Sequence, residues 1–154
     1  MYWLTLEKKK ELEEELEHLI INERIVVAKN IAKSLKDEPN MSENNDYITA
    51  IQKKEKLETR IAHLEDVIRN SVIIDENKKH DKVEVGATVI ILKKGDRRQK
   101  IFKIVGKEEI DLNLKKISWD SPIAKAMMDK KEGDRFDYKT RSGKINNYLI
   151  KKIF

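Results

Sequence analysis

Two long helix-forming runs, separated by a short polar segment, constrain the fold of this chain most strongly. From Thr5 to Lys36 there is no Gly and no Pro, and Glu, Lys, Leu and Ile dominate, a composition that favours α-helix. Thr5 can cap this helix, and Glu7 lies in its first turn, where the helix dipole favours an anion. A second run, with Ser42 as its candidate N-cap, extends to about Asn70. We predict two consecutive helices.

Each predicted helix carries one narrow apolar stripe. The spacing is three or four residues, with a change of phase near residues 20–23, and the stripes consist of Leu12, Leu16, Leu19, Val27, Ile31 and Leu35, then Tyr47, Ile51, Leu57, Ile61, Leu64 and Ile68. Two such helices bury their stripes best by packing antiparallel. Residues 1–75 are therefore predicted to form a coiled-coil hairpin about 45 Å long, at ~1.5 Å per residue. The polar segment "DEPNMSENNDY", residues 37–47, lies at its tip.

The remainder of the chain has the pattern of a small α+β domain. Residues 76–82 are predicted to form a linker and residues 83–154 the domain. The segments "ATVIILKK" and "QKIFKIVG" indicate strands on either side of a turn at Lys94-Gly95-Asp96, and "RFDYKT" and "INNYLIKKIF" indicate a closing hairpin. Between them "SPIAKAMMDKK" has helical spacing, with Pro122 at its start and Gly133 placed to end it. An antiparallel sheet with one helix follows.

Composition and charge exclude several classes of site. The 154 residues include no Cys, which excludes disulfides, thiolate metal sites and thiol catalysis, and His18, His63 and His80 share no ligand spacing. No window approaches the ~18 apolar residues of a membrane span, so we expect no membrane association and a cytoplasmic location. Residues 1–80 carry 14 basic and 17 acidic side chains, whereas residues 81–154 carry 19 and 11. The basic half could meet an anionic partner, or its charge could serve solubility alone.

Five segments in order resemble the bacterial GreA/GreB family of transcript cleavage factors. The most specific is "ISWDSPIAKAMMDKKEGD", residues 117–134, which is similar to the family's "NSPIAKAL.GK..GD" signature. The others are "LTLEKKKELEEELEHL" near the start, "ENNDY" before the second helix, "GATV" at 86–89, and the following "FKIVGKEEIDLNLKKIS". Together they span nearly the whole chain.

The resemblance implies a fold, a partner and an activity. It implies that the hairpin precedes a domain related to FK506-binding prolyl isomerases, and that this domain docks at the rim of the secondary channel of bacterial RNA polymerase. The hairpin would then enter the channel and stimulate the polymerase's own cleavage of backtracked RNA at the nascent 3′ end. The factor would be a monomer and no enzyme by itself, with no cofactor of its own, and its tip would help to hold a second Mg²⁺ that it shares with the polymerase.

The resemblance also assigns roles at the tip, with one departure. The family pattern Asp-(Leu)-x-Glu-Asn-x-Glu-Tyr matches residues 40–47, so Glu43 is expected to be the catalytic carboxylate that meets the shared metal. Asn40 occupies the position of the family's first catalytic aspartate, and a neutral amide brings no negative charge to a divalent ion. Asp37 and Glu38 lie two to three residues before Asn40 and are candidate replacements for the missing charge if the turn is reshaped. Pro39, which lies between them and Asn40, constrains the backbone there.

Further candidates lie outside the acidic pair. Lys36 falls where the family has a basic residue that can approach the RNA, although a solvated lysine on a coiled coil fits its position equally well. Asp120, Ser121 and Pro122 match the polymerase-docking loop, and Ser121 or Asp120 could also simply cap the following helix.

Three functions remain open from the sequence. The first is stimulation of transcript cleavage. The second, motivated by Asn40, is a channel-binding paralogue that modulates or inhibits polymerase without supporting cleavage. The third is a prolyl isomerase or chaperone, which the few aromatic residues of the second domain disfavour, because several are expected to fill its core.

Overall fold

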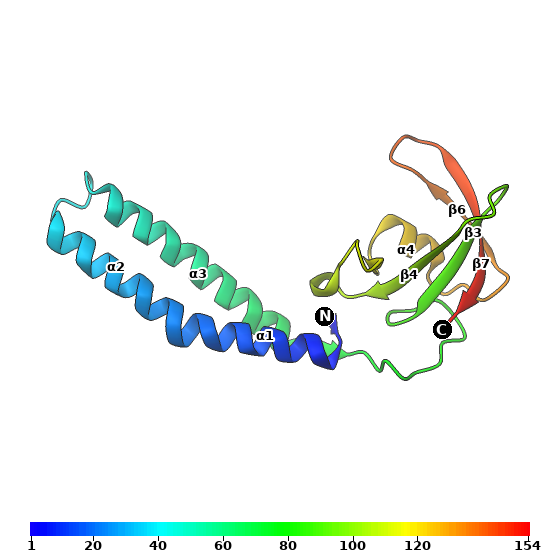
Figure 1. Cartoon of the computed structure of the whole chain (residues 1–154), viewed down its shortest axis with the longest axis horizontal. Coiled ribbons are helices and arrows are strands. Elements are labelled where there is room, and N and C mark those ends of the chain that lie inside the picture. The colour runs from blue at the N-terminus through cyan, green and yellow to red at the C-terminus, as the bar shows by residue number, and fades with distance from the viewer. The chain divides into compact units, whose positions relative to one another are not determined.

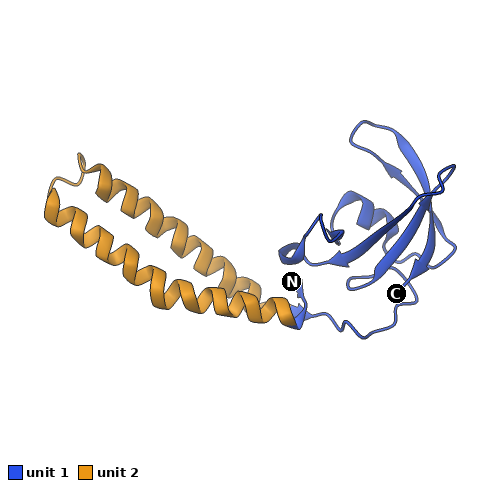
Figure 2. Cartoon of the chain, viewed as in Figure 1, with its two compact units in different colours: residues 1–6, 72–154 blue, residues 7–71 orange.

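The computed structural model describes all residues, 1–154, and divides the chain into two compact units (Figure 2). One unit is the segment Glu7–Ser71, and the other combines Met1–Leu6 with Val72–Phe154. The predicted division at residues 75 and 83 differs from this one at both ends of the hairpin. The first six residues and residues 72–75, all predicted to be part of the hairpin, belong with the sheet unit, and so do residues 76–82, which were predicted to be a linker.

The first unit is a helical hairpin (Figure 1). Its first arm is helical from Leu6 to Asp37 and consists of α1 (Leu6–His18), a π-helical segment (Leu19–Glu23) and α2 (Arg24–Asp37). The second arm is α3 (Asn45–Arg69), which runs antiparallel to the first. The predicted hairpin is confirmed, and the π-helical segment coincides with the predicted change of phase. A π turn adds one residue per turn and so rotates the apolar stripe relative to a regular helix.

The core of the hairpin is a single row of side chains. The buried members are Leu12, Val27, Ala50, Ile61, Leu64 and Val67, and the other residues of the predicted stripes are half-buried. Two bidentate ion pairs join the arms, Arg24 to Glu58 at 2.7–2.8 Å and Arg60 to Glu15 at 2.8 Å. Because Arg presents a planar fork to a carboxylate, these pairs fix the register between the arms.

The second unit is built on a five-stranded sheet with the order β5-β4-β3-β7-β6. The strands are β3 (Thr88–Lys93), β4 (Gln99–Val105), β5 (Lys116–Ser118), β6 (Arg135–Lys139) and β7 (Ile145–Ile153). The two hairpins and the turn at Gly95 are confirmed. The short strand β5 was not predicted, and it pairs parallel to β4, so the sheet is antiparallel at every pairing except this one.

One helix, α4 (Pro122–Met127), covers the inner face of the sheet. Ala124 and Met127 are fully buried among the strand residues, and Phe136 stacks on Tyr148 with ring centroids 5.5 Å apart, so aromatic residues do fill this core. The helix is shorter than predicted. Asp129 has a left-handed φ of 61°, and its N–H donates to the carbonyl of Val83, which draws the chain out of the helix before Gly133.

The N-terminal strand attaches to the sheet unit by a close backbone approach. Strand β1 (Tyr2–Leu4) pairs with β2 (Ser71–Ile73), and Leu4 is fully buried. A Cβ at Gly106 would lie 1.8 Å from the carbonyl oxygen of Trp3, so only glycine permits this contact. The backbone N–H of Thr5 donates to the carboxylate of buried Glu109 at 2.5 Å. These contacts explain why residues 1–6 leave the hairpin unit.

Candidate functional site

One buried side chain, Asn44, holds the tip of the hairpin together. Its amide nitrogen donates to the carbonyl oxygens of Ser34 at 2.8 Å and Glu38 at 2.6 Å, and its Oδ1 accepts from the N–H of Tyr47 at 2.8 Å. Asn44 is therefore the N-cap of α3, and it also bonds to two carbonyls at the end of α2, of which that of Ser34 accepts from the N–H of Glu38 as well. The predicted cap, Ser42, is wrong, because Ser42 lies in the turn before the cap and bonds to Asn40 instead.

Asn40 and Glu38 direct their side chains back onto the turn. The Oδ1 of Asn40 accepts from the N–H of Ser42 at 3.3 Å and from its hydroxyl at 2.8 Å, while Glu43 N–H donates to the Asn40 carbonyl at 3.2 Å. The carboxylate of Glu38 accepts from the N–H of Asn40 at 2.9 Å. Both side chains thus stabilise the local backbone, as Asx-type turns do.

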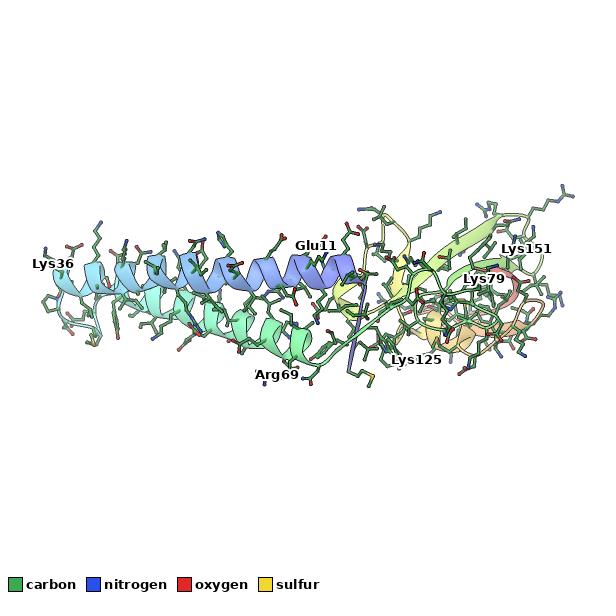
Figure 3. The ribbon with its side chains drawn as sticks, turned by 90° about the horizontal axis from the view of Figure 1, so that it is seen from below. Glu11, Lys36, Arg69, Lys79, Lys125 and Lys151 are labelled. Atoms are coloured by element: carbon green, nitrogen blue, oxygen red, sulfur yellow. The ribbon has the colours of Figure 1, made fainter.

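The carboxylates of Glu43 and Asp37 have no hydrogen-bond or ion-pair partner. Both residues are exposed, as is Lys36, which Figure 3 shows at the tip end of the hairpin. Glu43 lies on the turn itself, whereas Asp37 lines a groove between α2 and α3 together with Lys33 and Lys53. Of the predicted acidic residues, Glu43 is therefore the one whose charge lies on the turn and is unused by the fold.

The second predicted region, residues 118–122, is called the docking loop below. Ser121 is the N-cap of α4, where its hydroxyl accepts from the N–H of Ala124 at 3.3 Å, and Pro122 follows at the first helical position. The carboxylate of Asp120 forms an ion pair with Lys107 at 2.8 Å and accepts a short hydrogen bond from the Ser118 hydroxyl. The predicted capping role of Ser121 is confirmed. Asp120 does not cap the helix, because its carboxylate bonds to Lys107 and Ser118 instead.

These contacts change the acidity of Asp120. The hydrogen bond from Lys107, and then that from Ser118, lower the pKa of the Asp120 carboxyl below its ordinary value of 3.8. The side chain is therefore an anion at neutral pH, and its charge is balanced by Lys107, which lies outside the loop. The carboxylate of Asp120 therefore stabilises the loop, and its charge is already paired.

Neither region forms a metal-binding cluster by itself, since no group of three or more His, Asp or Glu side chains in the chain is arranged to hold a metal ion. No helix combines the length and the apolar character that crossing a membrane requires.

Both parts of the chain match models of one protein family. The model described as transcription elongation factor, GreA/GreB, C-terminal, matches residues 78–153, and that of the N-terminal domain matches residues 2–73. The chain belongs to the GreA/GreB family of transcription elongation factors. Two GreA relatives agree with this over nearly their full lengths. The transcription elongation factor GreA of Geobacillus kaustophilus is 38% identical over 94% of this chain and 91% of its own, and that of Shouchella clausii is 39% identical over 97% and 94%.

Among solved structures, the chain is similar to the GreA factor homolog 1 (Gfh1) of Thermus thermophilus. The two are 24% identical, the match covers 99% of this chain and 97% of the other, and the TM-score is 0.43.

Sequence reasoning about this GreA/GreB member missed Asn44 as the residue that organises the tip. The signal was present, because Asn is among the strongest N-cap residues and directly precedes the helical run. Ser42 fitted the same rule, however, and the bonds from Asn44 to Ser34 and Glu38, which decide between them, span ten and six residues.

Proposed function

We propose that this protein binds RNA polymerase through its secondary channel and stimulates the polymerase's cleavage of backtracked nascent RNA. The observation that carries the proposal is the Glu43 carboxylate, which is exposed and unpartnered on a turn held by the buried Asn44. Membership of the GreA/GreB family supports the class of partner. A fixed turn with a free carboxylate suits a side chain that must reach a site on another molecule.

In this proposal Glu43 is an additional ligand for the second Mg²⁺ of the polymerase. Bound Mg²⁺ would stabilise the charge that develops on the attacking and leaving oxygens during RNA hydrolysis. A single carboxylate fits that role, because Mg²⁺ takes hard oxygen ligands and is commonly held by one or two carboxylates with water. Asn44 would orient Glu43, and the docking loop with Asp120, Ser121 and Pro122 would fix the factor on the channel rim.

The remaining tip residues have supporting roles in this proposal. The carboxylate of Asp37 is unpartnered, so it could supply part of the negative charge that is missing at Asn40. Glu38 could do so only after breaking its hydrogen bond from the N–H of Asn40. Lys36, exposed at the end of α2, would attract the phosphates near the nascent RNA 3′ end.

A second function is favoured by one observation at Asn40. Its side-chain oxygen is already accepting from both the N–H and the hydroxyl of Ser42, so it is both neutral and engaged. A tip with one free carboxylate on its turn could occupy the channel without supporting cleavage. The protein would then modulate or inhibit the polymerase by binding alone.

The deciding experiment uses purified bacterial RNA polymerase stalled in a backtracked complex. We expect saturating factor to release short 3′-terminal RNA fragments, and Glu43→Gln to reduce the rate by about tenfold to a hundredfold, the range seen when groups that support a bound metal are removed. Glu14→Gln is the matched control, because Glu14 is equally exposed, has no partner and lies in α1.

The outcomes separate the two functions. Tight binding of the factor without any RNA release would favour the binding-only function. Release that is equally fast with Glu43→Gln would show that the tip assignment is wrong.

A further inference from the structure

The positive charge of the sheet unit is concentrated at one end of its sheet. Residues 81–154 carry 19 Lys or Arg and 11 Asp or Glu, a net charge of +8. Two segments, residues 93–100 and 135–144, carry nine of the basic residues and only two of the acidic ones, a net charge of +7. These two segments, called the basic end below, therefore hold nearly all of the unit's net charge.

The two segments are neighbours in the fold. Strands β3 and β7 pair so that Lys93 lies opposite Tyr148, which brings the β3–β4 turn beside the β6–β7 hairpin (Figure 1). The N–H of Lys94 donates to the carbonyl of Asn147 at 2.9 Å. The side chain of Asn147 in turn accepts from Arg135 at 3.2 Å and donates to Asp137 at 2.8 Å, both on β6. Asn147 thus links the β3–β4 turn to the β6–β7 hairpin.

Most cations of the basic end are unneutralised. Arg98 is paired with Asp96 at 3.2 Å, and Lys100 lies over the ring of Tyr148 at 5.8 Å. Five others are exposed and have no side-chain partner, namely Lys94, Arg97, Lys139, Arg141 and Lys144. Like charges gathered on two neighbouring segments repel one another, so a polyanion that lies across both segments would stabilise them.

The residue types select the kind of polyanion. Protein interfaces depend on buried apolar and aromatic anchors, and no exposed large apolar side chain lies within the basic end, although Ile101 and Ile145 flank it. Such side chains gather in the unit elsewhere, at Ile110, Leu112 and Leu114. Single-stranded nucleic acid is bound by stacking on exposed aromatic rings, and Phe136 and Tyr148 here are buried. A duplex carries closely spaced phosphates, about one charge per 1.7 Å, and binding to them requires neither apolar anchors nor exposed aromatic rings.

We propose that the basic end binds the phosphate backbone of duplex DNA, independently of sequence. No helix lies at this edge to enter the major groove, so the contacts are to phosphates and specify no base. Lys94 and Arg97 on one turn, with Arg141 and Lys144 on the other, would contact phosphates at separate points along the duplex. The interaction is separate from the channel entry proposed above and uses none of the tip or docking-loop residues.

The test measures binding of the full-length protein to a fluorescently labelled duplex of about 20 base pairs by anisotropy, over a range of salt concentrations. The test variant combines Lys94→Gln, Arg97→Gln, Arg141→Gln and Lys144→Gln. The control combines Lys10→Gln, Lys29→Gln, Lys79→Gln and Lys131→Gln, which removes the same charge from exposed lysines elsewhere. We expect at least about tenfold weaker binding and a salt slope lower by about 3 to 4 in the test variant only, because each phosphate contact contributes about 0.9 to the slope.

Three results would overturn the proposal. The first is absence of duplex binding by the wild type at low salt, and the second is an equal loss of affinity in the test and control variants. The third is binding of single-stranded DNA or poly-glutamate as tight as that of the duplex, which would indicate a general or protein-directed anion surface. The assay contains no polymerase, so its failure leaves the proposed cleavage function to its own test.

Discussion

The tip and the docking loop both begin a helix with a polar cap, yet they use it differently. At the tip, Asn44 is buried, only 5% exposed, and joins three backbone groups on two helices. In the docking loop, Ser121 is half-buried and makes one bond of 3.3 Å, while the acidic residue beside it, Asp120, is neutralised by Lys107. At the tip, the charge of Glu43 therefore remains available, and the turn depends for its stability mainly on the side chain of Asn44. In the docking loop, the charge of Asp120 is used in bonds to Lys107 and Ser118 that stabilise the loop.

The largest expected effect follows from removing the cap of the tip. Asn44→Ala would leave the carbonyls of Ser34 and Glu38 and the N–H of Tyr47 without this partner, so we expect the free energy of unfolding to fall by about 2–3 kcal/mol. Chemical denaturation followed by helical circular dichroism measures it. Asn45→Ala, the exposed neighbour, should change stability by less than about 0.5 kcal/mol. A loss below 1 kcal/mol in Asn44→Ala would mean that the two regions are capped alike.

The next effect concerns charge at the tip. Asn40→Asp keeps an oxygen that can accept from Ser42 and adds a negative charge to the turn, so we expect transcript cleavage to rise about threefold to tenfold, equivalent to about 1 kcal/mol. The rate of RNA release at saturating factor measures it. Asn45→Asp adds the same charge one residue beyond the cap and should have little effect. An equal rise in both variants would indicate that charge near the tip matters but its position does not.

The features that local spacing determines could be predicted from the sequence. The apolar stripes gave the hairpin, and the interruption in the stripe at residues 20–23 marked the π-helical segment at Leu19–Glu23. Periodicity reports such features because a helix buries the same face at every turn. Likewise, Ser121-Pro122 indicated the start of α4, since both preferences act within one turn.

The features that depend on distant contacts could not be predicted. Strand β1 joins the sheet unit because glycine at position 106 lets the backbone of Trp3 approach closely. This contact joins residues that are about a hundred positions apart in the sequence. Strand β5 and the early end of α4 at Met127 likewise depend on partners elsewhere, at Ile104 and Val83. For the candidate site, the residue types at the tip were visible in the sequence. Which of them remain unpartnered was decided by the turn, because Asn40 and Glu38 bond locally and Glu43 does not.

A smaller effect is expected for the cap of the docking loop. Ser121→Ala removes one part-buried hydrogen bond from the N–H of Ala124, so we expect a loss of about 0.5–1 kcal/mol in the stability of the sheet unit. Thermal unfolding, followed by the fluorescence of Trp119 beside the loop, measures it. Ser121→Asn should restore most of the stability, because Asn is an equally good cap. A loss as large as that of Asn44→Ala would contradict the difference drawn between the two caps.

The smallest effect is the pH dependence of the Asp120 ion pair. Because Lys107 and Ser118 lower the folded-state pKa of Asp120 below 3.8, this carboxylate stabilises the fold above its ordinary pKa, and the contribution disappears as the pH falls through the lower folded-state pKa. The pair is partly exposed to solvent, so we expect about 0.5 kcal/mol. Asp120→Asn should therefore be less stable than the wild type at pH 7 and equal to it at strongly acidic pH. Lys107→Gln should show the same pH dependence, and the double variant should lose little more than either single one, since both substitutions remove one interaction. If the two losses instead add, Asp120 is held mainly by Ser118, and the loop's charge is freer than the ion pair implies.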